Sequence, residues 1–316
     1  MRIVNLHRMI VLIAALAIYS IMPGCQLKYK GVQIGAITYS WRSMPSSTED
    51  IIKYCKEADI TDIELMGGVV EAYAGGPVDP RFPGNFQEMT EEQRQEFDEK
   101  REEYNRLASE WRKSTPTADK YRELRKMFDD AGIHIHIVKF APADWSNEEI
   151  DYAFESAKIL GAKGVSNELG HEACERLGKF AEKHNMVAVF HNHGQPGDLD
   201  FNFEEYLAYS PNIMLNFDAG HYSGATGKNP CEIIEKLHDR IFSIHLKDKT
   251  AKNADPPDTN MPWGEGDTPL GEILNLIQDN QWDIYCDVEL EYPIPEGSDA
   301  AKETAKCVAY ARSLLD

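Results

Sequence analysis

Eight short runs of β-forming residues alternate with helical segments along the chain, and this alternation constrains the fold more than any other feature. The runs occupy residues 32–38, 61–66, 133–139, 163–168, 186–190, 213–218, 241–247 and 284–289. Helical patterns lie between them, notably at residues 47–58, 147–160, 171–184, 230–238, 269–279 and 299–315. Strands that alternate with helices form a parallel sheet, and eight such strands close naturally into a barrel. The sequence therefore predicts a single-domain (β/α)₈ barrel of the TIM type.

Two longer segments interrupt this alternation. Residues 71–118 form an insertion after the second strand, which is rich in Gly and Pro at first and then becomes a charged helix at residues 91–111. Residues 249–268 form a long loop after the seventh strand. Because both segments follow strands, we expect them on the C-terminal face of the barrel, as walls or lids of a site. The insertion is also a candidate contact in a homo-oligomer, and the alternative is a solvent-exposed surface helix.

The first 25 residues have the parts of an export signal. Arg2, His7 and Arg8 precede an apolar stretch at residues 9–21, and Gly24 precedes Cys25. The apolar stretch is shorter than the ~20 residues that span a bilayer comfortably. Because Cys25 after a small residue resembles a bacterial lipobox, we expect an exported protein anchored through a lipid on Cys25, in the periplasm or at the cell surface. The alternative is plain secretion, and residues 26–316 form the mature barrel domain in either case.

The charge balance limits the partners of the chain. Its 33 basic and 53 acidic residues give a formal net charge of −20, so there is no basic stripe for a nucleic acid, and a polyanionic substrate is disfavoured. The six cysteines are widely spaced and form no CxxC pair, which excludes a zinc knuckle. Such a set indicates buried thiols, with a disulfide as the alternative in an oxidising compartment.

Side chains that bind metals or transfer protons lie at the C-terminal ends of the predicted strands. They are Glu64, Glu168, His191, His193, Asp218, His221, His245, Lys247, Asp248, Asp287, Glu289 and Glu291. These ends converge on one mouth of a barrel, and residues two apart share a face of their strand. Carboxylates that point inward together repel one another, and a divalent cation removes that repulsion. Oxygen ligands with one or two imidazoles suit a single Mn²⁺, Mg²⁺, Co²⁺ or Zn²⁺ ion.

A site of this kind supports the removal of a proton next to a carbonyl group. A metal that chelates a carbonyl and an adjacent hydroxyl stabilises the enediolate that forms. Reprotonation of this intermediate gives isomerisation or epimerisation, whereas expulsion of a β-leaving group gives dehydration or glycoside elimination. The predicted substrate is therefore a small keto-sugar, polyol or keto-glycoside, and the outcome of the proton transfer stays open.

Five motifs at these strand ends resemble those of the xylose isomerase-like, sugar phosphate isomerase/epimerase superfamily of TIM barrels. They are FHNH at residues 190–193, NFDAGH at 216–221, IHLKD at 244–248, WGEGD at 263–267 and DVELEY at 287–292. The resemblance covers residues 32–315. The strand-end pattern is most similar to that of inosose dehydratase-like members, because HNH on strand five resembles their histidine-rich HHH.

The resemblance implies a metal held by four side chains from successive strands, namely Glu168, Asp218, His245 and Glu289. Epimerase-like members have a glutamate about where His191 stands, so Glu168 takes the fourth position as in the inosose dehydratase-like branch. Two alternatives remain. Glu168 caps the helix that begins near residue 171, or Glu291 replaces Glu289.

The other strand-end residues are assigned to catalysis and to substrate binding. His193 is the predicted general base or acid, because a neutral imidazole near pH 7 suits that role. The further predicted catalytic residues are His191, Lys247 and Glu291. The predicted substrate-binding residues are Glu64, Lys139, His221 and Trp263, and the alternative for Trp263 is core packing.

Two other functions stay open from the sequence. The first is a non-catalytic carbohydrate-binding lipoprotein, whose mark would be the loss of a metal ligand. The second is a metal-dependent hydrolase, in which the spare Glu64, His221 and Glu291 would serve a second metal or a positioned water.

Overall fold

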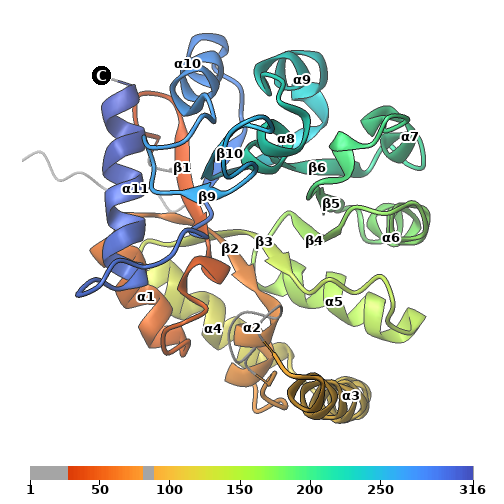
Figure 1. Ribbon diagram of the computed structural model, residues 1–316. Coiled ribbons are helices and arrows are strands. Elements are labelled where there is room, and N and C mark those ends of the chain that lie inside the picture. Colours follow the sequence, from red (N-terminus) through yellow and green to blue (C-terminus); the bar gives the residue numbers. More distant parts are fainter. Residues whose placement is uncertain (1–27, 81–88, 316) are drawn as a thin grey trace, which may run out of the picture.

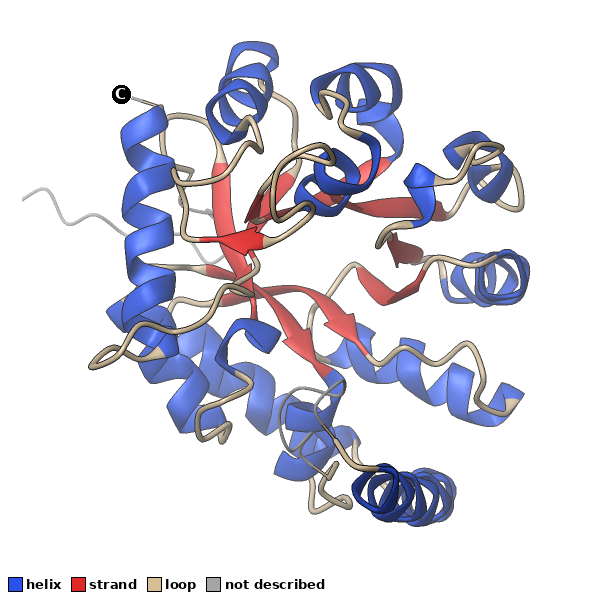
Figure 2. Cartoon of the chain, in the orientation of Figure 1, coloured by secondary structure: helices blue, strands red, loops and turns tan. Residues whose placement is uncertain are grey.

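The computed structural model describes residues 28–80 and 89–315, and in them eight parallel strands close into a barrel (Figures 1 and 2). Neighbouring strands pair in parallel, and the order around the barrel is β1, β2, β3, β4, β5, β6, β7 and β10. The strand bounds are β1 Gln33–Ile37, β2 Asp62–Met66, β3 His134–Lys139, β4 Gly164–Glu168, β5 Val187–His191, β6 Ile213–Asp218, β7 Ile241–Leu246 and β10 Tyr285–Val288. The predicted (β/α)₈ barrel is confirmed.

Helices surround the barrel on its outer side (Figure 1). Their bounds are α1 Thr48–Glu57, α2 Gly67–Tyr73, α3 Glu91–Ser114, α4 Ala118–Asp130, α5 Asn147–Ile159, α6 His171–His184, α7 Phe203–Leu207, α8 Ala219–Thr226, α9 Cys231–Leu237, α10 Leu270–Asn280 and α11 Ala300–Leu314. Three helices begin with a reciprocal capping box, formed by Ser47 with Asp50, Thr90 with Gln93 and Ser146 with Glu149. Each box satisfies two backbone N–H groups that the first turn leaves without partners.

The predicted export segment at residues 1–25 lies outside the described residues. Within residues 28–80 and 89–315, no helix combines the length and the hydrophobicity that crossing a membrane requires. Five cysteines fall in these ranges, and all five are free thiols: Cys55, Cys174, Cys231, Cys286 and Cys307. Four of them are buried, so the prediction of buried thiols holds for these four and no disulfide joins any of the five.

The described residues of the insertion after β2 lie away from the mouth of the barrel, whereas we had expected a wall or lid there. Figure 1 shows α3 at the periphery of the molecule, beside α2 and α5. Along this 24-residue helix Ala108 is the only buried residue among those described. The C-terminal end of α3 is held to the barrel by Arg112, which lies 2.7 Å from the buried carboxylate of Glu71 and stacks over Trp145. The surface-helix alternative therefore describes α3 better than a lid.

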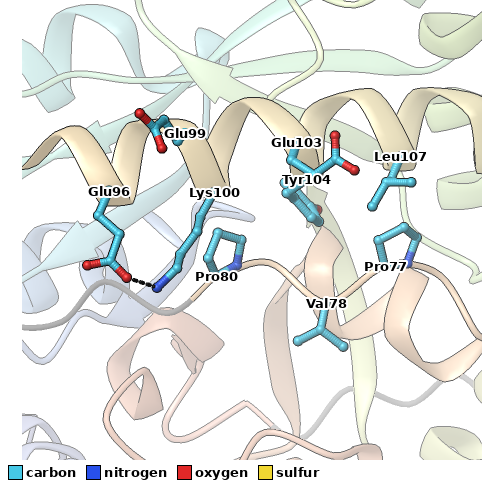
Figure 3. Close-up of a pocket in the computed structure, with 9 residues that line it drawn as sticks. All are labelled: Pro77, Val78, Pro80, Glu96, Glu99, Lys100, Glu103, Tyr104 and Leu107. Atoms are coloured by element: carbon cyan, nitrogen blue, oxygen red, sulfur yellow. Dashed lines mark hydrogen bonds and ion pairs between the residues drawn. The ribbon is translucent and has the colours of Figure 1, made fainter.

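A shallow pocket lies between α3 and the segment that follows α2. Figure 3 shows Pro77 and Pro80 of this segment facing Tyr104 and Leu107 of α3. None of its lining residues is among the predicted site residues. The pocket therefore belongs to the insertion and not to the strand ends.

The long loop after β7 is organised by one buried carboxylate. Asp248 accepts hydrogen bonds from the backbone N–H groups of Gly264, Gly266 and Thr268, at 2.8, 3.0 and 3.1 Å. A Cβ atom on Gly266 would lie 2.3 Å from Asp248 Oδ1, so only glycine fits there. Two short antiparallel strands of two residues each, β8 Asp248–Lys249 and β9 Asn260–Met261, pair within this loop. The IHLKD and WGEGD motifs are thus two halves of one structural unit.

Candidate metal centre

Four side chains with metal-binding chemistry meet where four neighbouring strands end. His191, Asp218, His245 and Glu289 each offer one ligand atom, these atoms lie within 4.8 Å of one another, and all four residues are buried. His191 ends β5, Asp218 ends β6, His245 lies in β7, and Glu289 follows β10. The strand register explains the meeting, because Asp218 is paired with His245 across β6 and β7. The strand ends of a parallel barrel thus carry a compact donor set.

Asp218 caps a helix with one carboxylate oxygen and faces the group of ligand candidates with the other. It is the N-cap of α8, where Oδ1 accepts a hydrogen bond from the backbone N–H of His221 at 2.7 Å. Asn192 accepts from the backbone N–H of Asp218 at 2.9 Å and donates to its carbonyl at 3.2 Å. With one oxygen used in the cap, Oδ2 faces the Nε2 atom of His191 at 3.1 Å. The NFDAGH motif therefore fixes the direction of this carboxylate.

Three carboxylates surround the ring of His191. Its Nδ1 atom is 3.2 Å from Glu168 Oε2, and its Nε2 atom is 3.1 Å from Asp218 Oδ2 and 3.7 Å from Glu289 Oε2. Burial alone would lower the pKa of His191, but its hydrogen bonds to Asp218, Glu168 and Glu289 raise it to about 9. In the absence of a metal both ring nitrogens of His191 therefore carry a proton at neutral pH, and the ring is positively charged.

His245 is held in the same way, with its ring reversed. Its Nδ1 atom lies 2.9 Å from Glu289 Oε2, and its Nε2 atom lies 2.7 Å from Glu64 Oε2. Burial opposes the charged form, but the two carboxylates raise the pKa of His245 well above its usual value. Burial also opposes the ionised form of Glu289, yet Lys247 and His245 hold the pKa of Glu289 well below its usual range.

Glu168 lies beside this group rather than in it. Its side chain is 45 % exposed, and its Oε1 atom lies 2.7 Å from Lys139 Nζ. Its Oε2 atom faces His191, as above, and His193 Nδ1 at 3.4 Å. The structure therefore groups His191, and not the predicted Glu168, with the other three ligand candidates. The capping alternative is wrong, because Gly170 is the N-cap of α6 and no side chain caps that helix.

Lys247 is surrounded by three carboxylates. Its Nζ atom lies 2.9 Å from Asp218, 2.8 Å from Glu289 and 2.7 Å from Glu291. Burial opposes its charge, but these acids raise the pKa of Lys247 above its usual range. Gly220 of the NFDAGH motif makes room for this lysine, since a Cβ there would lie 2.3 Å from Lys247 Cγ.

The donor set and its charge fit a divalent cation. Asp218, Glu289 and Glu291 supply three negative charges, and the ammonium of Lys247 balances one of them. Without a metal, protons on His191 and His245 offset two further negative charges of the surrounding acids, because both pKa values are raised. One divalent ion would supply the same charge and would release both imidazole nitrogens as ligands.

Two further histidines lie at the mouth of the barrel. His193 is half-exposed, and burial together with the charge of His191 lowers its pKa. His221 contacts Lys249 Nζ at 3.4 Å, and burial together with Lys247 and Lys249 lowers its pKa to about 4, against the opposing effect of Asp218. Their ring centroids are 5.1 Å apart. Both rings are thus neutral bases near pH 7, next to the four-residue group.

Two of the predicted substrate-binding residues are not available to a substrate. Glu64 is completely buried beneath His245. Trp263 is 9 % exposed and packs edge-on against Tyr310 within the hydrophobic core, as the alternative stated. These positions argue against the predicted contacts of both residues. The other two, Lys139 and His221, do lie beside the four-residue group. Lys139 pairs with Glu168, and the backbone N–H of His221 donates to Asp218.

The polar residues below the centre were not among the predicted site residues. Asn216 donates to Glu64 at 2.8 Å, and Ser243 donates to Asn216 Oδ1 at 2.7 Å. Ser166 donates to the other oxygen of Glu64 at 2.5 Å. The signal was present, because Asn216 stands two residues before Asp218 and Ser243 stands two before His245, on the same face of each strand.

Comparison with known proteins identifies the family to which this barrel is similar. The family of xylose isomerase-like TIM barrels matches residues 103–311. An inosose dehydratase of Clostridium perfringens is 26 % identical over 212 residues, covering 58 % of this chain and 69 % of that protein. An inosose dehydratase of Clostridium botulinum is 29 % identical over 153 residues, covering 45 % of this chain and half of that protein.

Solved structures show the same fold at lower identity. A sugar phosphate isomerase/epimerase from Parabacteroides distasonis superposes with a TM-score of 0.58 at 15 % identity, covering 92 % of this chain and 98 % of that one. A D-psicose 3-epimerase from Clostridium cellulolyticum gives a TM-score of 0.59 at 9 % identity, covering 90 % of this chain and all of that one. At these identities the likeness concerns the fold.

Proposed function

The chain belongs to the family of xylose isomerase-like TIM barrels, and we propose that it is a divalent-metal-dependent enzyme that removes a proton next to the carbonyl group of a small keto-sugar or keto-polyol. The observation that carries this proposal is the buried group of His191, Asp218, His245 and Glu289 at the C-terminal mouth of the barrel. Buried acids and imidazoles at such close range are costly unless a cation joins them.

We propose dehydration as the outcome of the proton removal. Sequence relatives of this chain are inosose dehydratases. Isomerisation or epimerisation is the second candidate, favoured by the fold shared with a sugar phosphate isomerase/epimerase and a D-psicose 3-epimerase. Both outcomes begin with the same proton removal, so the residues below serve either.

The four buried residues would hold the metal, with Glu168 and Glu64 behind its two histidines. A divalent ion there would act as a Lewis acid on the substrate carbonyl and would make the neighbouring C–H group more acidic. Lys139 holds Glu168 in place through the 2.7 Å contact between Nζ and Oε1. Glu168 in turn orients both His191 and His193 through its second oxygen.

We assign the base to His193. Its lowered pKa keeps the ring unprotonated near pH 7, and its half-exposed side chain can reach a substrate in the mouth. The ring takes the proton from carbon, and the C–H electron pair becomes the enediolate. In dehydration the same proton leaves His193 with the departing hydroxyl as water, which gives syn elimination. In isomerisation His193 returns the proton to the neighbouring carbon, while the hydroxyl hydrogen passes to the former carbonyl oxygen and a new carbonyl group forms at the carbon that lost its proton.

The cations near the centre are already paired with acids, which supports an uncharged substrate. Lys139 is engaged by Glu168, and Lys247 is engaged by Asp218, Glu289 and Glu291. A phosphate group would have to compete with these carboxylates for either lysine. A neutral polyol needs only hydrogen bonds, which His221, Glu291 and Lys139 offer at the mouth.

Metal analysis of the purified barrel domain tests this proposal first. We expect about one divalent ion per chain, and we expect none in an Asp218→Ala, His245→Ala double variant. The loaded protein should exchange the α-proton of inosose and of ketohexoses for solvent deuterium, and it should release water from its true substrate. A metal-free wild-type protein that still binds sugars would favour a carbohydrate-binding lipoprotein instead. A metal-loaded protein that hydrolyses glycosides without proton exchange would favour a hydrolase.

We also propose that the protein is exported and anchored through Cys25, because the first 25 residues have the composition of a lipoprotein signal. Export would direct the enzyme to extracellular carbohydrate. Growth with labelled palmitate tests this proposal: wild-type protein should take up the label in the membrane fraction, and a Cys25→Ala variant should not. An unlabelled, unprocessed wild-type protein would overturn it.

A further inference from the structure

Glu64 is a fully buried acid whose oxygens act as acceptors. Ser166 donates to its Oε1 atom at 2.5 Å, and Asn216 donates to its Oε2 atom at 2.8 Å. The orientation of Asn216 is fixed, because its Oδ1 atom accepts the hydroxyl hydrogen of Ser243 at 2.7 Å and only its amide group can face Glu64. A carboxylate held by two donors in this way has a definite position and a definite direction.

The third neighbour of Glu64 is the proposed metal ligand His245. The Nε2 atom of His245 lies 2.7 Å from Glu64 Oε2, which is a hydrogen-bond distance. An ionised carboxylate can only accept, so the hydrogen between the two atoms belongs to His245. The amide nitrogen of Asn216, which donates to the same Glu64 oxygen, also lies 3.0 Å from Nε2 of His245. A neutral imidazole has one N–H group, so a ring protonated at Nε2 has its lone pair at Nδ1. In the metal-free protein Nδ1 lies at hydrogen-bond distance, 2.9 Å, from Glu289 Oε2, and loss of the Nδ1 proton would leave the lone pair on the side of the four-residue group.

We propose that Glu64 is a positioning residue for the metal centre: it accepts the Nε2–H group of His245 and so directs the Nδ1 lone pair of that ring to the cation. This inference rests on the proposed metal centre. Glu64 was predicted to bind substrate; we place it instead behind a metal ligand, beneath the centre. A carboxylate behind a metal-binding histidine fixes the ring and its tautomer and increases its basicity, and its loss costs about 10–100-fold in metal affinity.

A neighbouring acid provides a matched control. Asp287 is also completely buried, and it is paired with His245 in the register of β7 and β10. Its carboxylate lies within 4.8 Å of a ring nitrogen of His245, but its hydrogen bond, at 2.8 Å, is to Nε2 of His136. A Glu64→Gln variant and an Asp287→Asn variant therefore both neutralise a buried acid beneath the centre, but only the first changes the partner of His245.

The experiment measures Co²⁺ affinity and the visible Co²⁺ spectrum of the full domain for wild type, Glu64→Gln and Asp287→Asn. We expect Glu64→Gln to bind Co²⁺ about 10–100-fold more weakly with an altered spectrum, and Asp287→Asn to stay within about threefold of wild type. Equal weakening in both variants, or none in Glu64→Gln, would overturn the role of Glu64. Absence of Co²⁺ binding in all three proteins would instead overturn the metal centre itself.

A measurement on the wild type keeps the inference testable if Glu64→Gln does not fold. In the Zn²⁺-loaded protein, ¹⁵N-histidine NMR spectra report which ring nitrogen carries hydrogen and which binds metal. We expect His245 to be protonated at Nε2 and metal-bound at Nδ1, with assignment from a His245→Gln variant. Metal bound at Nε2 of His245 would overturn the inference, while leaving the metal centre intact.

Discussion

His191 and His245 turn opposite ring nitrogens toward the same carboxylate. Nε2 of His191 lies 3.7 Å from Glu289 Oε2, and Nδ1 of His245 lies 2.9 Å from that oxygen. The far nitrogen of each ring faces another acid, Glu168 for His191 and Glu64 for His245. The centre is therefore approximately symmetric in its chemistry, with two histidines that are each backed by a glutamate.

This arrangement predicts different effects for His191 and Glu168. A His191→Ala variant should lose more metal affinity than the about 10–100-fold typical of an outer partner, because it removes a ligand. A Glu168→Gln variant should stay within that range, because it removes only the partner of the ring. Isothermal titration with Mn²⁺ or Co²⁺ measures both variants. If Glu168→Gln loses the metal while His191→Ala keeps it, Glu168 is the fourth ligand after all.

Metal affinity should rise with pH, because protons occupy the ligand nitrogens in the metal-free protein. The pKa of His191 is raised to about 9 from its usual value of 6.5, and that of His245 is also raised. Metal binding must displace these protons, so it should release protons into the buffer and should tighten between about pH 6.5 and pH 9. Titration in buffers with different ionisation enthalpies counts the protons. An affinity that does not change over this range would contradict the prediction.

The stability of the metal-free protein should change with pH in the opposite direction. Because the folded-state pKa of His191 lies above its unfolded value, the stability that this proton contributes is fully present below about pH 6.5 and is lost as the pH rises through about 9. Urea unfolding in EDTA at several pH values measures the change. A His191→Gln variant should show a smaller loss across the same window, and an equal loss would assign the effect to other groups.

Lys247 and a metal would share two oxygen atoms, and this predicts an effect on affinity. The ammonium group touches Asp218 Oδ2 and Glu289 Oε2, both of which the proposed centre uses. A Lys247→Met variant removes the positive charge but keeps a side chain of similar length. The metal should therefore bind more tightly, by about tenfold or more, while turnover falls. Lys249→Met is the matched control, since Lys249 pairs with Asp258 and touches none of the four ligand candidates. Weaker metal binding in Lys247→Met would show that the lysine supports the centre instead.

Much of the fold and part of the site could be predicted from the sequence. The alternation of strands and helices predicted the barrel, and the strand ends predicted that Asp218, His245 and Glu289 meet. Local pattern suffices there because each of these residues lies at or next to the end of a strand whose inward face is set by a period of two.

The remaining assignments depend on depth and register, which local pattern does not contain. Glu168 and His191 are paired across β4 and β5, so both are strand-end residues, and only the packed structure shows that the histidine reaches the centre. Glu64, predicted to lie near the end of its strand, is the middle residue of β2 and lies below His245. Trp263 is in a loop whose course is set by the distant carboxylate of Asp248. These three results follow from tertiary contacts.

The glycine of the NFDAGH motif gives a test of how tightly the centre is packed. A Cβ on Gly220 would lie 2.3 Å from Lys247 Cγ and 2.7 Å from the Lys247 carbonyl oxygen. Gly220→Ala should therefore displace Lys247 and lower the free energy of unfolding by about 1–3 kcal/mol. Gly68→Ala is a close control, because Gly68 is also the second residue of a helix that follows a barrel strand, and a Cβ there meets nothing within 4 Å. Alanine at position 68 should leave stability unchanged or raise it by up to about 1 kcal/mol, since alanine favours helix. Denaturant unfolding measures the stability of the two variants. Equal stabilities would show that Lys247 moves aside freely. Its contacts with Asp218 and Glu289 would then not depend on the packing against Gly220.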